Sequence, residues 1–338
     1  MEEGIYSVLF NIENGSFTVE NKTPNILNPS FLALSPDKDF LYAVHSKEGS
    51  STGKVSAFKI DPKDGSLLYL NTVDSEGRGP CYISIVPSGQ WILVANYSSG
   101  NVVVLPVLSN GQLGPATDNK QHIGSSINLE RQKEPHAHYI RMGIENLVFA
   151  ADLGTDEVML YHLDQKRGVL SSFSQASIKL DPGSGPRHLT FHPDEKHLYI
   201  LNELLGTVTE VEYQANERRF LKKQTISSLP KDFKGNNNSA DIHVHPTGKF
   251  LYASNRGDLN SVTVFKVKEK TGKLKLIEIE KEGIIWPRNF AIDPYGKYLL
   301  VANKDDDSII CFTIDEQDGS LSPTGQRIPL PMPMCIQF

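Results

Sequence analysis

The chain has 338 residues and a formal net charge of −6, with 22% charged residues and no long run of Lys or Arg. This acidic balance disfavours a nucleic acid or an acidic membrane surface as partner. The N-terminal MEEGIYSVLFNIENG does not have the basic and then apolar pattern of a signal peptide, and the longest apolar runs, such as residues 102–108, are too short to span a bilayer. Cys81, Cys311 and Cys335 cannot all pair within the chain. We therefore predict a cytoplasmic protein with reduced, mostly buried thiols.

Two short strands open the chain, and a longer unit then recurs. Residues 4–12 (GIYSVLFNI) and 15–21 (GSFTVEN) alternate apolar and polar residues, which predicts two strands. The recurring unit begins with segments such as PSFLALSPDKDFLYAVHS from Pro29 and PRNFAIDPYGKYLLVANK from Pro287. We call its first residue the anchor, and the anchors are Pro29, Pro80, Pro135, Pro186, Ser239, Pro287 and Pro333. Their spacings of 51, 55, 51, 53, 48 and 46 residues leave room for four short strands in each unit.

The pattern inside a unit predicts antiparallel strands. In LALSPDKDFLYAV, two period-two apolar runs flank a Pro-Asp-Lys turn, which is a hairpin signal. Residues 261–267 and 271–279 show the third and fourth strands of one unit, and no helical periodicity extends over a useful length. We predict an all-β, seven-bladed β-propeller with four antiparallel strands per blade, forming a single domain over residues 1–338. A solenoid is disfavoured because no capping repeat is present.

The last blade is predicted to be shared between the N- and C-termini. The segment PMCIQF from Pro333 would supply its innermost strand, and residues 4–12 and 15–21 its third and fourth strands. No segment corresponds to a second strand, so this blade either lacks one strand or is completed by residues upstream of Met1.

Columns of equivalent residues separate what every blade needs from what only some blades provide. The column that ends the second strand is small and polar, which suits turn capping: His45, Asn96, Asp152, Asn202, Asn255 and Asn303. The next column varies in size and charge: Ser46, Tyr97, Leu153, Glu203, Arg256 and Lys304. The column after the anchor also varies: Ser30, Cys81, His136, Arg187, Ala240, Arg288 and Met334. Both variable columns lie at the same end of the two inner strands, so we expect their charges to gather at the mouth of the central channel.

His138 also departs from the repeat. It lies two residues after His136, on the same side of the strand, where other units place apolar residues such as Leu189 and Phe290. A single polar residue at a strand end is usually solvated or satisfied by a neighbour. Several such departures at one predicted end of the blades indicate a site.

One carboxylate, two histidines and several cations suit an anionic substrate whose reaction develops more negative charge. Arg187 and Arg256 could bind phosphate or carboxylate oxygens and stabilise an oxyanion. Glu203 would stay ionised beside them, and His136 or His138 could move a proton near neutral pH. Hydrolysis or formation of a lactone that carries an acidic group meets these demands. No nucleophile elbow, phosphate loop or dinucleotide fingerprint occurs, and carboxylates are sparse beside the evenly spaced histidine pairs, so we expect neither a metal nor a cofactor.

The chain resembles the seven-bladed propeller lactonase family, which includes bacterial 6-phosphogluconolactonases and fungal carboxy-cis,cis-muconate lactonizing enzymes. The resemblance spans most of residues 28–338, and its segments are VANYSSGNVVVLPV, RQKEPHAHYI, AADLGTDEVMLY, GPRHLTFHP with ILNELLGTV, ASNRGDLNSVTVF and WPRNFAIDPYGKYLLVANK. It implies an active site without metal or cofactor, built from His, Arg, Glu and Arg. By motif these fall on His136 or His138, and on Arg187, Glu203 and Arg256. The family's usual opening strand, with a Gly-Thr-Tyr-like segment, is absent here.

We therefore predict a cytoplasmic carboxylic ester hydrolase that converts 6-phospho-D-glucono-1,5-lactone to 6-phosphogluconate in the pentose phosphate pathway. Arg288 and Lys304 are predicted as outer cations for this small anionic substrate, and Asn202 and Asn255 as further substrate contacts. A muconate-type lactonizing enzyme is an alternative, because a tricarboxylate would need the same cations. A non-catalytic propeller scaffold is a second alternative, although the Trp-Asp ending of the best-known scaffold repeat does not occur. The sequence does not fix the oligomeric state.

Overall fold

The computed structural model describes residues 4–47 and 49–338. Within them the regular structure is β, apart from two three-residue 3₁₀ turns, η1 (Ile144–Asn146) and η2 (Lys304–Asp306). The strands form six four-stranded antiparallel sheets and one two-stranded sheet. The all-β prediction is therefore confirmed.

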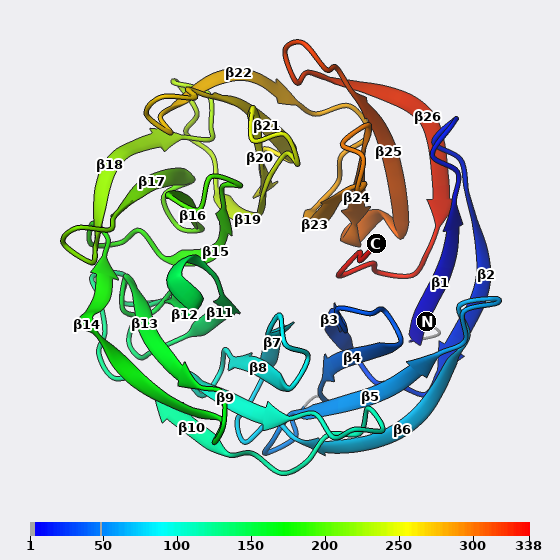
Figure 1. The fold of residues 1–338 in the computed structure, drawn as a ribbon. Helices are drawn as coiled ribbons and strands as arrows, with labels where there is room; N and C mark the ends of the chain where they lie inside the picture. Colours follow the sequence, from blue (N-terminus) through cyan, green and yellow to red (C-terminus); the bar gives the residue numbers. More distant parts are fainter. Residues whose placement is uncertain (1–3, 48) are drawn as a thin grey trace. The chain divides into compact units, whose positions relative to one another are not determined.

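The first compact unit, mainly Val19–Gly183, contains three four-stranded sheets. In chain order their strands are β3 (Pro29–Leu34), β4 (Phe40–His45), β5 (Lys54–Ile60), β6 (Leu67–Asp74); β7 (Pro80–Ile85), β8 (Trp91–Asn96), β9 (Asn101–Pro106), β10 (Asp118–Gln121); and β11 (Ala137–Met142), β12 (Leu147–Asp152), β13 (Glu157–Asp164), β14 (Val169–Lys179). The first strands of successive sheets, β3, β7 and β11, contact one another, while the fourth strands lie at the outer edges (Figure 1).

The second compact unit, mainly Ser184–Ile336, repeats this plan. Its strands are β15 (Pro186–Phe191), β16 (His197–Asn202), β17 (Thr207–Gln214), β18 (Arg219–Ser227); β19 (Asn237–Val244), β20 (Phe250–Gly257), β21 (Ser261–Val267), β22 (Leu274–Glu280); and β23 (Pro287–Ile292), β24 (Tyr298–Asn303), β25 (Ser308–Ile314), β26 (Leu321–Pro329). Here β15, β19 and β23 are the neighbouring first strands. The strand predicted at residues 261–267 coincides with β21, and the one predicted at 271–279 corresponds to β22.

Apolar side chains between successive sheets form the core. In the second unit one cluster joins the sheets β15–β18 and β19–β22 through residues such as Tyr199, Leu201 and Phe265. Another joins β19–β22 and β23–β26 through residues such as Tyr252 and Phe290. Because both faces of a second strand meet a neighbour, all six residues of β16 and all six of β24 are buried.

The hairpin between the first two strands of a sheet turns at the predicted proline segment. The second residue after the proline has a positive φ in five sheets, at Lys38 (60°), Gly89 (72°), Glu195 (56°), Gly248 (76°) and Gly296 (74°). A left-handed residue closes such short hairpin turns, and glycine adopts it without steric cost. The hairpin prediction from LALSPDKDFLYAV is thus confirmed.

Each first strand carries a one-residue bulge, which follows the first residue in five sheets and lies further along in β19. Pro186 pairs with Asn202 and His188 with Leu201, so Arg187 is the extra residue. The same shift makes the following residues the extra ones in four other sheets: Ser30, Cys81, His138 and Arg288. In the fifth sheet, Ala240 and Asp241 together occupy the bulge. A bulge reorients the side chain that it contains and is common beside functional sites.

The bulge in β11 corrects one predicted column. Ala137, not Pro135, pairs with the last residue of β12, Asp152. The structural equivalent of Arg187 is therefore His138. His136 is instead equivalent to Gly185, because the backbone N–H of Leu153 donates to the His136 oxygen (3.0 Å) as that of Glu203 donates to Gly185 (2.7 Å). The error arose because Pro135 mimics an anchor but lies two residues too early.

The chain ends differ in part from the prediction. Strands β1 (Gly4–Phe10) and β2 (Phe17–Pro24) form the two-stranded sheet, as expected from their alternation. The tip of this hairpin belongs to the second unit, where the Phe10 ring packs edge-on against Tyr298 and Phe338, with centroids 5.5 and 5.6 Å away. Residues 333–338 are described but form no strand, so sharing of the last blade between the termini stays a prediction.

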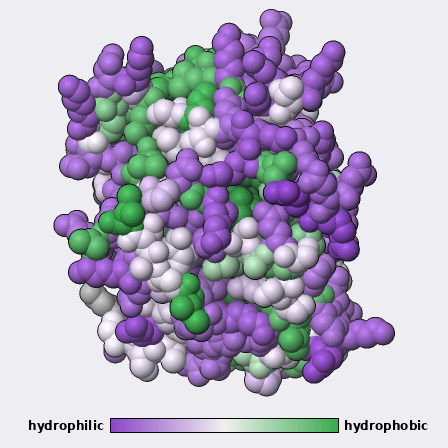
Figure 2. Space-filling view, turned by 90° about the vertical axis from the view of Figure 1, so that its left-hand side faces the viewer, coloured by the Kyte–Doolittle hydropathy of each residue, from purple (hydrophilic) through white to green (hydrophobic). Residues whose placement is uncertain are grey.

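The described part of the chain contains no helix that is both long and apolar enough to cross a membrane. One face of the molecule, shown in Figure 2, is covered mainly by hydrophilic residues, with one larger hydrophobic area near the top of the view and smaller hydrophobic groups elsewhere.

Candidate functional site

Two buried arginines hold one buried carboxylate in the second unit. Arg187 lies in the bulge of β15, Glu203 follows the end of β16, and Arg256 lies near the end of β20. Glu203 Oε2 is 2.9 Å from Arg187 Nε and 3.4 Å from Arg256 Nη2. All three side chains are at most 6% exposed. The sequence predicted these three residues as one group, and the structure brings them together.

Backbone carbonyls orient both guanidinium groups. Arg187 Nη1 donates to the carbonyl of Ala240, the bulged residue of the neighbouring sheet. Arg256 Nε donates to the carbonyl of Asn238 at 3.0 Å, because β19 extends far enough to pair Asn238 with Arg256 itself. The planar fork of arginine is thus held in place by groups that cannot rotate.

In this cluster two guanidinium groups face the carboxylate of Glu203, and burying charged groups costs several kcal/mol unless partners compensate them. A bound anion would add charge-assisted hydrogen bonds to the guanidinium groups. The arrangement therefore suits a phosphate, a carboxylate or an oxyanion.

Trp286 borders this cluster, and no sequence pattern pointed to it. Its indole ring lies 5.7 Å from Arg256 Cζ, a cation–π distance, and its side chain is half-buried. Its backbone has a φ of 51°, while Gly79 and Gly185, which also precede the first strand of a sheet, have 62° and 63°. A bulky residue in this conformation is strained, and such strain concentrates at functional sites.

The histidine pair lies in the first unit. His136 is half-buried, its Nδ1 donates to the carbonyl of Tyr97 (3.0 Å), and its ring stacks on that of Tyr97 at 4.5 Å. His138 is 5% exposed, and its ring meets Tyr97 edge-on at 5.5 Å. Arg131 donates from Nη2 to the hydroxyl of Tyr97 at 3.3 Å. Tyr97 stood in a variable column but was not selected from the sequence, because an aromatic residue there also fits a purely structural role.

The predicted outer cations and asparagines have different environments. Arg288 is half-buried in the bulge of β23. Lys304 begins η2 and pairs with Asp305, with Nζ 2.6 Å from Oδ1. Asn202 and Asn255 are fully buried, and their amide groups donate within their own sheets, for example to Thr209 and Thr263 at 3.0 and 3.1 Å. This geometry favours the turn-capping role of that column over a substrate contact.

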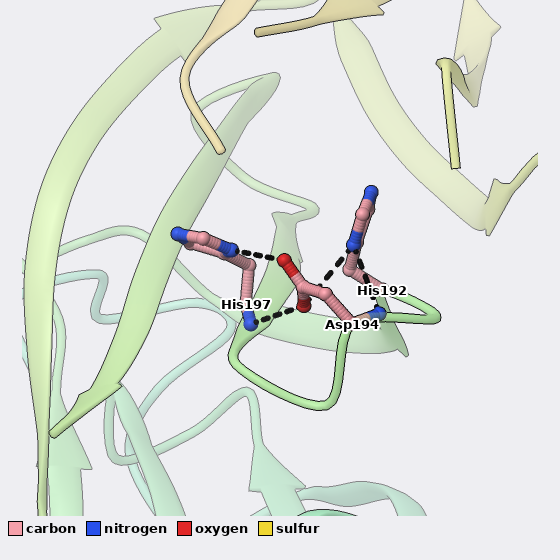
Figure 3. Close-up of side chains that lie close together, drawn as sticks. All are labelled: His192, Asp194 and His197. Atoms are coloured by element: carbon pink, nitrogen blue, oxygen red, sulfur yellow. Dashed lines mark hydrogen bonds and ion pairs between the residues drawn. The ribbon is translucent and has the colours of Figure 1, made fainter. Parts of the chain in front are cut away.

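A group of possible metal ligands lies at the other end of the fourth sheet. His192, Asp194 and His197 place one ligand atom each within 4.8 Å of one another around the β15–β16 turn (Figure 3). The carboxylate of Asp194 accepts the backbone N–H groups of Lys196 (2.8 Å) and His197 (3.0 Å), and also His197 Nδ1 (2.7 Å). Burial by itself would raise the pKa of Asp194, but these hydrogen bonds outweigh it and lower the pKa to about 2.

The repeat explains this group without a metal. His192 Nε2 lies 3.0 Å from the carbonyl of Gly248 in the next turn. His245, at the same position in the next sheet, makes the same contact with Gly296 at 2.8 Å. The position of His192 is therefore a structural feature of successive turns, and we interpret the group as a turn lock.

Comparison with known proteins agrees with this architecture. The family described as "Lactonase, 7-bladed beta-propeller" matches residues 1–338. A 6-phosphogluconolactonase of Bacillus subtilis is 36% identical over 99% of this chain and 94% of its own length, and one of Formosa agariphila is 37% identical over 96% and 92%. A periplasmic gluconolactonase structure from Pseudomonas aeruginosa superimposes with a TM-score of 0.93 at 32% identity, over 98% of this chain and 94% of the other. The protein belongs to the family of seven-bladed β-propeller lactonases.

Proposed function

We propose that the protein is a carboxylic ester hydrolase whose substrate is 6-phospho-D-glucono-1,5-lactone. The observation that carries this proposal is the buried cluster in which Arg187 and Arg256 both contact the carboxylate of Glu203. Two neighbouring guanidinium groups suit a phosphorylated lactone, and the full-length relatives named 6-phosphogluconolactonase support the same substrate.

The reaction opens the lactone ring with water. Water adds to the carbonyl carbon, the carbonyl oxygen takes up negative charge, and the bond to the ring oxygen then breaks to give a carboxylic acid and a hydroxyl group. A guanidinium group that donates to the developing oxyanion lowers this barrier, and a second one can hold the phosphate. We assign these two roles to Arg187 and Arg256, with Glu203 as the brace that orients both.

Proton transfer is assigned to one of the two histidines that the sequence predicted. His138 is our preferred residue because it occupies the bulge position that Arg187 occupies in its own sheet, and because it is 5% exposed. His136 is held by its contacts with Tyr97. Arg288 is proposed as an outer cation for the substrate, and Lys304 as a weaker one because Asp305 already neutralises it.

Cellular context and the completion of the last blade follow the sequence predictions. We propose a place in the pentose phosphate pathway, which the substrate implies, and a cytoplasmic location. We also propose that the whole chain forms one propeller domain, whose seventh blade is completed by the two chain ends. Removal of residues 333–338 should then lower the melting temperature; an unchanged value would contradict this completion.

The test is hydrolysis by purified protein, measured as acid release above the spontaneous rate. We expect turnover of 6-phospho-D-glucono-1,5-lactone and little of the uncharged glucono-1,5-lactone. Arg187→Lys loses the planar fork but keeps the charge, so kcat/KM should fall roughly 10²-fold. His138→Asn should lower kcat more than His136→Asn does.

Arg219→Lys is the matched control. Arg219 pairs with Glu217 at 3.5 Å on the same sheet as Arg187, but both side chains are more than half exposed, so activity should stay within about twofold of wild type. If the wild-type protein is inactive on the phosphorylated lactone but turns over a muconate-derived lactone, the cluster instead serves the lactonizing reaction. Equal activity of Arg187→Lys and wild type would refute the site.

A further inference from the structure

One strand position differs systematically between the two units. It is the residue that follows the bulge in each first strand. In the first unit it is aromatic, and Phe31, Tyr82 and Tyr139 pack in succession with ring centroids 4.3 and 4.4 Å apart. In the second unit the corresponding residues are His188, Asp241 and Asn289, which are buried and polar. The propeller repeat does not require polar residues here, since the first unit does without them.

These three polar residues form one hydrogen-bonded chain. His188 Nδ1 lies 2.7 Å from Asp241 Oδ1, and Asn289 Nδ2 donates to Asp241 Oδ2 at 2.5 Å. His243 Nε2 reaches the same Oδ2 at 2.9 Å. Asn289 Oδ1 in turn accepts a hydrogen bond from the backbone N–H of Ile336 at 2.7 Å, so these side chains also hold the C-terminal residues of this unit. A buried carboxylate with this many donors is fully satisfied and rigid.

This hydrogen-bonded chain of side chains ends at the guanidinium group of Arg187. His188 Nε2 lies 3.2 Å from Arg187 Nη1. A carboxylate only accepts and a guanidinium only donates, so Asp241 requires the proton of His188 on Nδ1, and Arg187 requires the lone pair on Nε2. Both neighbours therefore select the same neutral tautomer. Burial and the charge of Arg187 favour neutrality too, since they lower the pKa of His188 to about 4.

We propose that Asp241 and His188 are positioning residues that fix the orientation of the Arg187 guanidinium group towards its anionic ligand. Asp241 acts through His188: it fixes the tautomer and the ring plane, and the ring then offers Nε2 to Arg187. Burial alone would raise the pKa of Asp241, but His243 and His188 hold it well below its ordinary value, so the carboxylate stays ionised. This inference rests on the proposed role of Arg187.

Two substitutions of His188 separate its two contacts. The amide nitrogen of Asn in His188→Asn can replace Nδ1–H and still donate to Asp241, but it offers no acceptor to Arg187. The amide oxygen of Gln in His188→Gln can replace Nε2 and accept from Arg187, but it loses Asp241. We expect kcat/KM for the phosphorylated lactone to fall about tenfold in His188→Asn and in Asp241→Asn, and less in His188→Gln.

The readouts distinguish positioning from general stability. In wild type, the ¹⁵N shifts of the His188 ring should report protonated Nδ1, and Asp241→Asn should increase the tautomer protonated at Nε2. His245→Asn is the matched control, because His245 is 6% exposed and also makes hydrogen bonds through both ring nitrogens, yet lies at the turn. It should lower the melting temperature without changing kcat/KM.

Each outcome either supports or overturns the proposal. If the His188 and Asp241 variants melt at lower temperature but keep wild-type kcat/KM, the hydrogen bonds from Asp241 through His188 to Arg187 have only a structural role and the proposal is wrong. A wild type inactive on every acidic lactone instead refutes the proposed function. In that case calorimetric titration with 6-phosphogluconate tests positioning by itself: Asp241→Asn should weaken binding about tenfold, and unchanged binding, or none in wild type, overturns the inference.

Discussion

Glu210 on β17 is fully buried, and neither of its carboxylate oxygens has a hydrogen-bond partner among residues 4–47 and 49–338. Burial is the main reason that its pKa rises to about 7 from an ordinary 4.5. We predict that Glu210→Gln stabilises the protein at alkaline pH, because the substitution removes a charge that the folded state must otherwise bury.

The sign and size follow from linkage between protonation and folding. Between pH 4.5 and 7 the folded state keeps the Glu210 proton while the unfolded state releases it, so the free energy of unfolding falls as pH rises. The difference of 7 − 4.5 in pKa corresponds to ~3 kcal/mol once both states are ionised. Gln has no such dependence. The gain should therefore be below ~1 kcal/mol at about pH 5 and approach ~3 kcal/mol at about pH 8.5.

The assay is urea unfolding at those two pH values, with the free energy extrapolated to water. Glu212→Gln is a matched control on the same strand. Hydrogen bonds to Lys196 and Lys223, at 2.6 and 2.9 Å, lower the pKa of Glu212 to about 2. Its stabilisation is complete above about pH 4.5 and is lost only as pH falls through 2, so Glu212→Gln should destabilise equally at both test values.

A gain in Glu210→Gln that is the same at both pH values would refute this reasoning, as would no gain at pH 8.5. The second result would mean that the nearby cations of Lys223, Lys273 and Lys196 balance the buried carboxylate.

Three substitutions test positions with a positive φ. Trp286→Gly relieves the strain of a φ of 51°, so the free energy of unfolding should change by no more than ~1 kcal/mol. If the indole supports Arg256, kcat/KM should nevertheless fall roughly tenfold. Unchanged kinetics would leave Trp286 without a role in the site. Gly272 has a φ of 64°, and a Cβ added there would lie 2.3 Å from the His197 ring. Gly272→Ala should therefore lower the free energy of unfolding in urea by roughly 2–4 kcal/mol without affecting kcat/KM. Gly325 has a φ of 76°, but a Cβ added there would meet no atom of the described residues within 4 Å, so Gly325→Ala should cost only ~1 kcal/mol. Equal losses in both glycine variants would contradict the contact argument.

Much of the site could be predicted because repeats supply internal controls. Glu203 and Arg256 stood out because equivalent columns hold other residue types, and the structure joins them to Arg187 within 3.4 Å. Trp286 could not be found this way. Its importance depends on a backbone angle and on contact with Arg256, which lies thirty positions earlier in the chain.

The sequence by itself determined the β architecture, because period-two alternation and proline turns are local signals that each strand and hairpin carries within a few residues. It also located the charged positions on the strands. Only the tertiary structure decided the register of β11, where a bulge makes His138, not His136, the equivalent of Arg187. Because this bulge lies beside the start of β11, the residues after it still alternate regularly, and only the pairing of the two strands reveals it. The chain from Asp241 through His188 to Arg187 likewise depends on side chains from neighbouring sheets, 53 residues apart, meeting in space.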